Sequence, residues 1–156
     1  MRLRSLALAC AIAVLASYPA LAQTNPLVGA WERFSDINAQ GVQQQPPSPP
    51  AFVIFSADGF FSQTAIPTGR AKVDKPLQQM TKDELIARFD RVVARQGTYT
   101  IVGNRLTRHE LSNSNPSVVG SDQIQLFKIE GDTLIFTTGE PNSKAEVRFR
   151  RAKKTS

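Results

Sequence analysis

The chain has 156 residues, a formal net charge of +6 and one cysteine, Cys10, which lies in an apolar run near the amino terminus. Beyond that run we therefore expect no disulfide, no thiol nucleophile and no cysteine-ligated metal. Residues 23–156 are enough for one domain of ordinary size, whose stability must come from a packed core.

The amino terminus has the features of a secretory signal peptide. A basic start, Met1–Arg4, precedes an apolar run, Leu6–Ala16, and Ala20 and Ala22 occupy the small-residue positions of a cleavage site. The apolar run is shorter than the ~20 residues that a membrane-spanning helix needs. We therefore expect cleavage after Ala22, a mature domain of residues 23–156, a periplasmic or secreted location and no membrane span.

The positive charge is concentrated at the carboxyl terminus. Without residues 1–22 the chain keeps 17 Lys and Arg against 13 Asp and Glu, a net charge of +4. A run this short, without interleaved aromatic residues, is more typical of a solvated strand end than of a site for nucleic acid or anionic lipid. We expect no nucleic-acid partner. The run consists of Arg148, Arg150, Arg151, Lys153 and Lys154.

The first third of the mature chain predicts three strands and one stiff loop. The first strand, 28–35, contains Trp31, the only tryptophan, which we expect in the core. Residues 43–50 include four prolines, which favour an extended loop and exclude a paired strand. The second and third strands, 51–55 and 60–66, flank an Ala-Asp-Gly turn.

One amphipathic helix is expected over about 81–95. Thr81 and Glu84 have the spacing of a capping box. We expect the apolar stripe to pack the helix on the barrel or over its mouth, although the stripe could instead bind a partner. Charged residues, among them Arg88 and Arg95, take the other faces. The stripe consists of Leu85, Ile86, Phe89, Val92 and Val93.

Two β-hairpins are the strongest local signals in the chain. Residues 99–106 and 127–134 are each two short alternating runs that flank a Gly-Asn or Gly-Asp pair. With the strands before them, they predict an eight-stranded antiparallel up-and-down β-barrel with one helix. The last five strands are expected at about 96–102, 105–112, 121–129, 133–138 and 145–151.

Two-residue loops fix the register of both hairpins. Tyr99 then lies opposite Arg108, Gly97 opposite Glu110, and Ile129 opposite Leu134. One face of these strands is plainly apolar and should point into the barrel. It holds Tyr99, Ile101, Leu106, Phe127, Ile129, Leu134 and Phe136.

The same face also carries four polar residues, all toward one end of the barrel. Buried polar groups without partners are costly, so this pattern predicts a cavity in which a few polar side chains orient a small molecule. Two alternatives stay open: the strands splay and leave a wet rim, or Arg108 and Glu110 satisfy each other. The four residues are Arg108, Glu110, Gln123 and Gln125.

No catalytic constellation or cofactor motif is evident. His109 is the only histidine, and its parity places it on the outer face of its strand. Without a second histidine or a cysteine it cannot form an ordinary metal pair, so we expect no metal and no cofactor.

An ordered series of motifs resembles the bacterial lipocalin-like domain family. Leu27-Val-Gly-Ala-Trp31 resembles its opening Leu-x-Gly-x-Trp, and Phe55–Ser62 is similar to its Tyr-Thr-x-Asp-Gly-Tyr-Met-Ser segment. Gly97–Ile101, His109 and Glu130–Leu134 follow in the order and spacing of the second half of such domains.

The resemblance implies a calycin-type antiparallel barrel in an exported member of the family. It also implies that the tryptophan of the first strand packs at the closed end, where an arginine from near the carboxyl terminus covers it. Trp31 matches the first role, and Arg151 is the candidate for the second. The resemblance names no single activity, and a proline-rich loop is unusual for it.

We therefore predict an exported lipocalin-like barrel that binds a small hydrophobic or amphipathic molecule. Tyr99, Phe127 and Phe136 would form apolar walls, and the four polar residues would orient the polar head, with Arg108 favouring an anionic group. One alternative is an isomerase or cyclase that uses the same cavity, with Glu110 or Tyr99 as its acid–base group. Another is an interaction module that uses the proline-rich loop, the helix stripe or the basic tail.

Overall fold

The structure is a computed structural model that describes residues 25–45, 51–67, 70, 72, 74–138, 140 and 142–153. The expected signal segment 1–22 and residues 46–50 of the proline-rich loop lie outside the described residues. Cleavage after Ala22 and the conformation of that loop therefore stay predictions.

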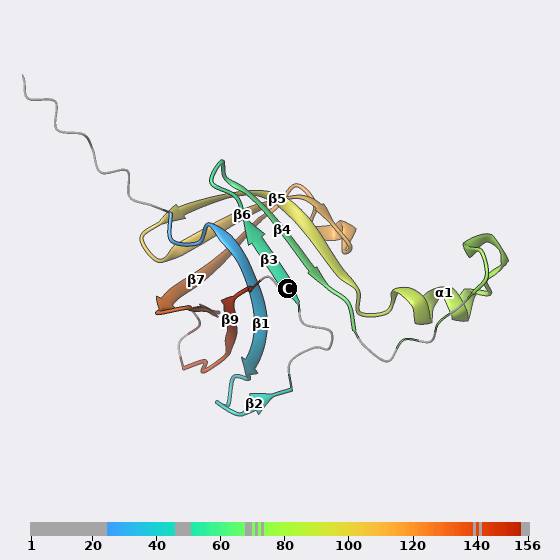
Figure 1. Cartoon of the computed structure of the whole chain (residues 1–156), viewed down its shortest axis with the longest axis horizontal. Helices are drawn as coiled ribbons and strands as arrows, with labels where there is room; N and C mark the ends of the chain where they lie inside the picture. The colour runs from blue at the N-terminus through green and yellow to red at the C-terminus, as the bar shows by residue number, and fades with distance from the viewer. Residues whose placement is uncertain are drawn as a thin grey trace, which may run out of the picture.

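Eight antiparallel strands close into a barrel, as the sequence predicts (Figure 1). Neighbouring strands along the chain are neighbours in the sheet, and the pairing of β1 with β9 closes it. A short additional strand, β2 (Gln43–Gln44), pairs with the end of β1. The prediction that residues 43–50 exclude a paired strand is wrong for these two residues, because they precede the prolines and keep their backbone N–H donors. The barrel strands are β1 (Gly29–Ile37), β3 (Phe52–Phe55), β4 (Phe60–Ala65), β5 (Val93–Val102), β6 (Arg105–Asn113), β7 (Asp122–Glu130), β8 (Thr133–Thr137) and β9 (Glu146–Arg151).

Both predicted hairpins have two-residue loops. Gly103 and Gly131 occupy the first loop positions with φ of 61° and 57°, the positive values that a type II′ turn requires there. The strand pairings that follow are the predicted ones, and Tyr99 lies opposite Arg108. The parity argument about which side chains face inward therefore applies to these four strands.

A single apolar core fills the barrel from the end at which β1 begins. It draws side chains from every barrel strand, as expected when one alternating set of residues points inward. Ile101, Ile129 and Val147 pack against it. The buried members are Leu27, Trp31, Val53, Phe55, Phe61, Tyr99, Leu106, Phe127, Leu134, Phe136 and Phe149.

Arg151 covers Trp31 at this end. The guanidinium carbon of Arg151 lies 3.9 Å from the centroid of the Trp31 ring. The same guanidinium donates hydrogen bonds to the carbonyl oxygens of Val28 at 2.6 Å and Pro26 at 3.1 Å. This is the arrangement that the family resemblance implies, and it joins the last strand to the segment that leads into the first.

The helix is shorter than predicted. α1 spans Lys82–Phe89 and begins with the predicted capping box of Thr81 and Glu84. It does not continue to residue 95, because Arg91 adopts a left-handed φ of 54° and Val93 begins β5. Strand pairing with β4 and the β preference of the two valines at 92 and 93 outweigh the helical periodicity there. Two short 3₁₀ turns, η1 (Leu77–Gln79) and η2 (Pro116–Val118), complete the described elements.

The helix does not pack on the barrel or over its mouth, so that prediction is wrong. α1 buries no residue and stands clear of the strands, beyond the ends of β4 and β5 (Figure 1). Ile86 and Phe89 are each 56% exposed. The predicted stripe loses Val92 and Val93, which lie beyond the end of the helix, and what remains is too short to cover the barrel.

Candidate functional site

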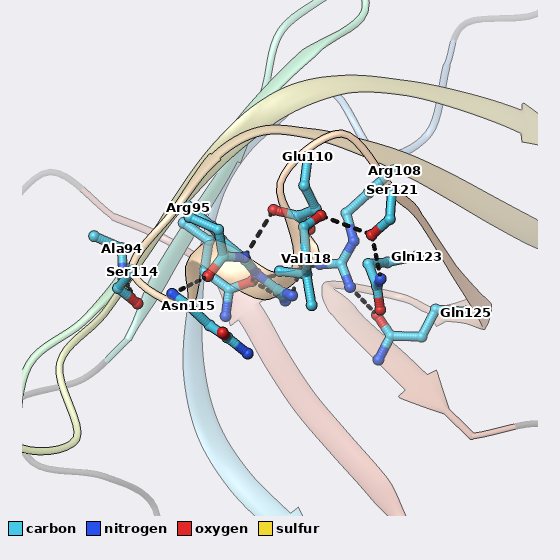
Figure 2. A network of polar contacts seen from close by, with 12 residues as sticks. Ala94, Arg95, Arg108, Glu110, Ser114, Asn115, Val118, Ser121, Gln123 and Gln125 are labelled. Carbon is cyan, nitrogen blue, oxygen red and sulfur yellow. Dashed lines mark hydrogen bonds and ion pairs between the residues drawn. The ribbon is translucent and has the colours of Figure 1, made fainter.

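A layer of polar side chains lies inside the barrel at the end opposite Trp31. The connections β1–β3, β4–β5, β6–β7 and β8–β9 meet at this end because the strands alternate in direction. β4 to β7 supply the layer from their inward-facing positions, and Figure 2 shows most of its contacts. The polar layer consists of Gln63, Arg95, Arg108, Glu110, Gln123 and Gln125.

Arg108 is the centre of the polar layer and rests on the apolar core. Only 3% of it is exposed, and its guanidinium carbon lies 5.6 Å and 5.9 Å from the ring centroids of Phe61 and Phe136. It donates hydrogen bonds to the amide oxygens of Gln125 at 2.7 Å and Gln63 at 3.4 Å. Its Nε has no hydrogen-bond partner among the described residues. Arg108 is thus a buried cation whose direct contacts are aromatic rings and neutral amide oxygens.

Arg95 is a second inward-facing arginine, on β5. Its Nε and Nη2 donate to the amide oxygen of Gln63 at 3.0 Å and 2.6 Å. The sequence predicts a helix that reaches residue 95, which would place Arg95 on a polar helix face, and it does not single out Gln63. Side chains alternate along a strand, so a strand that begins before residue 95 would predict that Arg95 faces inward like Tyr99.

Glu110 is the only fully buried carboxylate among the described residues. Its Oε1 lies 3.7 Å from Nη1 of Arg95 and has no hydrogen-bond partner among the described residues. Its Oε2 accepts a hydrogen bond from Asn113 at 3.0 Å. The alternative in which Glu110 pairs with Arg108 is therefore not the observed arrangement, because the Arg108 guanidinium turns to the aromatic rings and Gln125. In Figure 2 the Glu110 carboxylate lies between the two arginines.

The two glutamines of β7 differ in their contacts. Gln125 accepts the 2.7 Å hydrogen bond from Arg108 and so belongs to the centre of the layer. Gln123 donates to the hydroxyl of Ser121 at 3.0 Å, at the edge of the layer (Figure 2). Both are half-buried, so the layer reaches solvent on this side.

The layer carries an excess of positive charge. Its ionisable groups are two guanidiniums and one carboxylate, a sum of +1. Burial, and then repulsion from Arg95, lower the pKa of Arg108 to about 9, while Glu110 opposes the shift. Burial also lowers the pKa of Arg95. With a pKa of about 9, Arg108 is still charged at neutral pH, so the layer can attract an anion.

Gly97 lets β5 and β6 approach closely beside Glu110. The register shifts by one residue between Gln96 and Gly97, which marks a β-bulge. A Cβ built on Gly97 would lie 1.8 Å from the carbonyl oxygen of His109, closer than any side chain could fit. Because of the bulge, Arg95 lies opposite Asn113 of β6 while Gly97 lies opposite Glu110.

The three aromatic residues expected as pocket walls all lie in the packed core. Tyr99 points toward the closed end, where its hydroxyl donates to the carbonyl oxygen of Ser56 and accepts from the amide of Asn25, both at 2.7 Å. Burial raises its pKa. Phe127 and Phe136 are buried as well, and the Phe136 ring touches the polar layer through Arg108.

A family model described as a lipocalin-like domain matches residues 47–153. The chain belongs to the lipocalin-like domain family. No curated protein sequence matches this lipocalin-like chain.

A solved structure with low sequence identity has the fold of this lipocalin-like chain, and a second one is similar to it more weakly. A lipocalin-like protein from Bacteroides uniformis ATCC 8492 is 15% identical, with a TM-score of 0.50 over 81% of this chain and 98% of that one. An uncharacterized protein from Bacteroides eggerthii DSM 20697 is 12% identical, with a TM-score of 0.48 over 81% and 99% of the two chains.

The other candidate features of this lipocalin-like chain lie outside the barrel interior. His109 is on the outer face, as predicted, where its Nδ1 lies 2.8 Å from the carboxylate of Asp122. In the basic tail, Arg148 and Arg150 contact Glu146 and Glu32 at 2.6 Å and 3.0 Å. Over the described residues no group of three or more His, Cys, Asp or Glu side chains could hold a metal. No described helix has the length and apolar character to cross a membrane.

Proposed function

We propose that this lipocalin-like protein binds a small, partly apolar molecule with an acidic group inside the barrel, at the end where the polar layer lies. The observation that carries the proposal is the environment of Arg108. A nearly fully buried guanidinium with an unpartnered Nε loses its hydration without gaining a hydrogen bond to a carboxylate in return. An acidic ligand group would supply the missing partner.

The apolar part of the ligand would lie against the ring of Phe136, with Phe127 and Tyr99 behind it. The polar head would contact the residues that the sequence singled out. Arg108 and Gln125 are already joined to each other, and Glu110 and Gln123 flank them. Few convergent polar groups above an apolar surface are typical of small-molecule sites in barrels.

A fluorescent apolar anion, 1-anilinonaphthalene-8-sulfonate, tests the proposal. We expect one saturable site in the wild-type protein, weakened at least ~10-fold by Arg108→Gln because a charged partner is lost. Arg105→Gln is the matched control, since Arg105 lies on the same strand but on the exposed outer face. Equal weakening by both changes, or no saturable site in the wild type, would contradict a site at Arg108.

We also propose that the protein is exported. The support is the amino-terminal sequence, with its basic start, its short apolar run and Ala20 and Ala22 before the expected cleavage point. Expression of the full chain in a Gram-negative host should give a periplasmic protein whose amino terminus is Gln23. An intact Met1 on protein recovered from the cytoplasm would refute both the location and the cleavage site.

A further inference from the structure

The two arginines of the polar layer converge on one neutral atom. The amide oxygen of Gln63 accepts from Nε and Nη2 of Arg95 and, at 3.4 Å, from Nη1 of Arg108. Two guanidiniums directed at one oxygen make the geometry that suits a carboxylate. Here an uncharged side chain fills that position, so neither cation is neutralised there.

The one buried carboxylate does not fill this position. Glu110 contacts Arg95 from another side, at 3.7 Å, and is held by Asn113. It offsets one of the two positive charges through Nη1 of Arg95, whereas Nε and Nη2 of Arg95 contact the Gln63 oxygen. The formal charges of the ionisable residues in the polar layer therefore sum to +1.

This remaining charge has a consequence for the ligand. One negative charge brought into the layer would make it neutral, whereas two would leave a buried negative charge without a counterion, which is costly. We infer that the site selects a singly charged carboxylate on an apolar chain, bound where Gln63 meets Arg95 and Arg108, and that Glu110 sets this limit on the charge. The inference rests on the proposed ligand-binding function and adds to it the class of ligand.

The path to this position runs past Arg95. The Arg95 side chain is 21% exposed and Gln63 is half-buried, whereas Arg108 and Glu110 are enclosed. An incoming carboxylate would meet Arg95 first and reach Arg108 as it displaces the uncharged amide of Gln63. Its apolar chain would then lie toward the Phe61 and Phe136 rings that flank Arg108.

Three probes of equal chain length test the charge limit: octanol, octanoate and octyl phosphate, titrated calorimetrically at about pH 8, where the phosphate carries close to two charges. The wild type should bind octanoate more tightly than either of the others. Glu110→Gln raises the charge of the layer to +2 and should shift the affinity ratio toward octyl phosphate by about 10-fold or more. Arg95→Gln lowers the charge to zero and should remove the advantage of octanoate over octanol.

The double change Arg95→Gln with Glu110→Gln returns the charge to +1. It should restore the preference for octanoate, and it decides the case should Glu110→Gln alone fail to fold. Arg105→Gln, which changes the same charge on the outer face, should leave all the ratios as in the wild type.

A second variant examines the position itself. Gln63→Glu keeps the shape of the side chain and places a carboxylate where the two arginines converge. It should weaken octanoate binding at least ~10-fold while the binding of octanol changes little.

The outcomes separate the two proposals. If octanol and octanoate bind equally well to the wild type, the binding of a small apolar molecule stands, whereas the acidic group of the ligand and the charge inference are contradicted. The inference also falls if octyl phosphate is preferred by the wild type, or if Glu110→Gln leaves the ratio unchanged. If none of the three probes binds the wild type, the ligand-binding function and the inference fall together.

Discussion

The backbone of β5 at Gly97 lies against the backbone of β6 at His109, so closely that no other residue fits. A Cβ at Gly97 would approach the carbonyl oxygen of His109 to 1.8 Å, and the nearby carbonyl carbon and the amide nitrogen of Leu111 lie within 3.0 Å. All of these neighbours are backbone atoms, which cannot move aside as a flexible side chain would.

Gly97→Ala should therefore destabilise the protein by about 2–4 kcal/mol, because the two strands must separate at the bulge. Urea unfolding followed by circular dichroism measures the change. Gly103→Ala is a useful comparison. It has open space around the position but a positive φ, so only the smaller cost of backbone strain, about 1 kcal/mol, applies. A Gly97→Ala protein as stable as the wild type would show that the strands are not this close.

Arg108→Met should stabilise the unliganded protein while it removes anion binding. The change replaces a buried cation by an apolar side chain of similar length above the rings of Phe61 and Phe136. The gain should be on the order of 1 kcal/mol, since the hydrogen bond to Gln125 is lost as the desolvation cost disappears. Thermal unfolding compared with wild type checks the direction, and a lower melting temperature would count against an unsatisfied charge at this site.

The binding of an acidic ligand should weaken as the pH rises through about 9. Burial lowers the pKa of Arg108 to about 9, well below the ordinary value of an arginine, so the folded protein loses this charge before the unfolded chain does. Above about pH 9 the unfolded chain therefore holds the extra proton, so the contribution of Arg108 to stability rises with pH while its attraction for an anion is lost. Octanoate titrations across this range should show the fall in the wild type. In Arg108→Gln that step should be absent, and its persistence there would assign it to another group.

The exposed helix should tolerate polar substitution. Ile86→Ser with Phe89→Ser removes the two most exposed apolar side chains of α1, neither of which is buried against the barrel. We expect the free energy of unfolding to change by less than ~1 kcal/mol, the range of ordinary surface changes. Phe136→Ala, in the core, should cost about 3–5 kcal/mol in the same urea experiment. A large loss from the helix substitutions would mean that α1 packs on the barrel after all.

The barrel could be predicted because its signals are local. The glycines at 103 and 131 fix two-residue loops, and each loop fixes the facing residues of two strands. That parity also brought Arg108, Glu110, Gln123 and Gln125 to one end of the interior. The same parity predicts from the sequence alone that His109 points outward.

The missed features depend on contacts that no local pattern records. The end of α1 is set by a left-handed Arg91, and arginine is not a residue type that marks such positions. Because the predicted end of the helix is wrong, the predicted position of Arg95 is wrong as well. A helix that continued to residue 95 would have kept this side chain away from Gln63. Strand parity predicts that Glu110 faces inward, but it does not predict which of the two arginines its carboxylate contacts. That contact depends on the side-chain conformations inside the barrel.

The closure of β1 on β9 has a consequence for biosynthesis. Trp31 is synthesised before Arg151, yet the barrel end is complete only when the second covers the first. The sheet of a nascent chain therefore cannot close until β9 has left the ribosome, because the contacts that close it join residues far apart in the sequence.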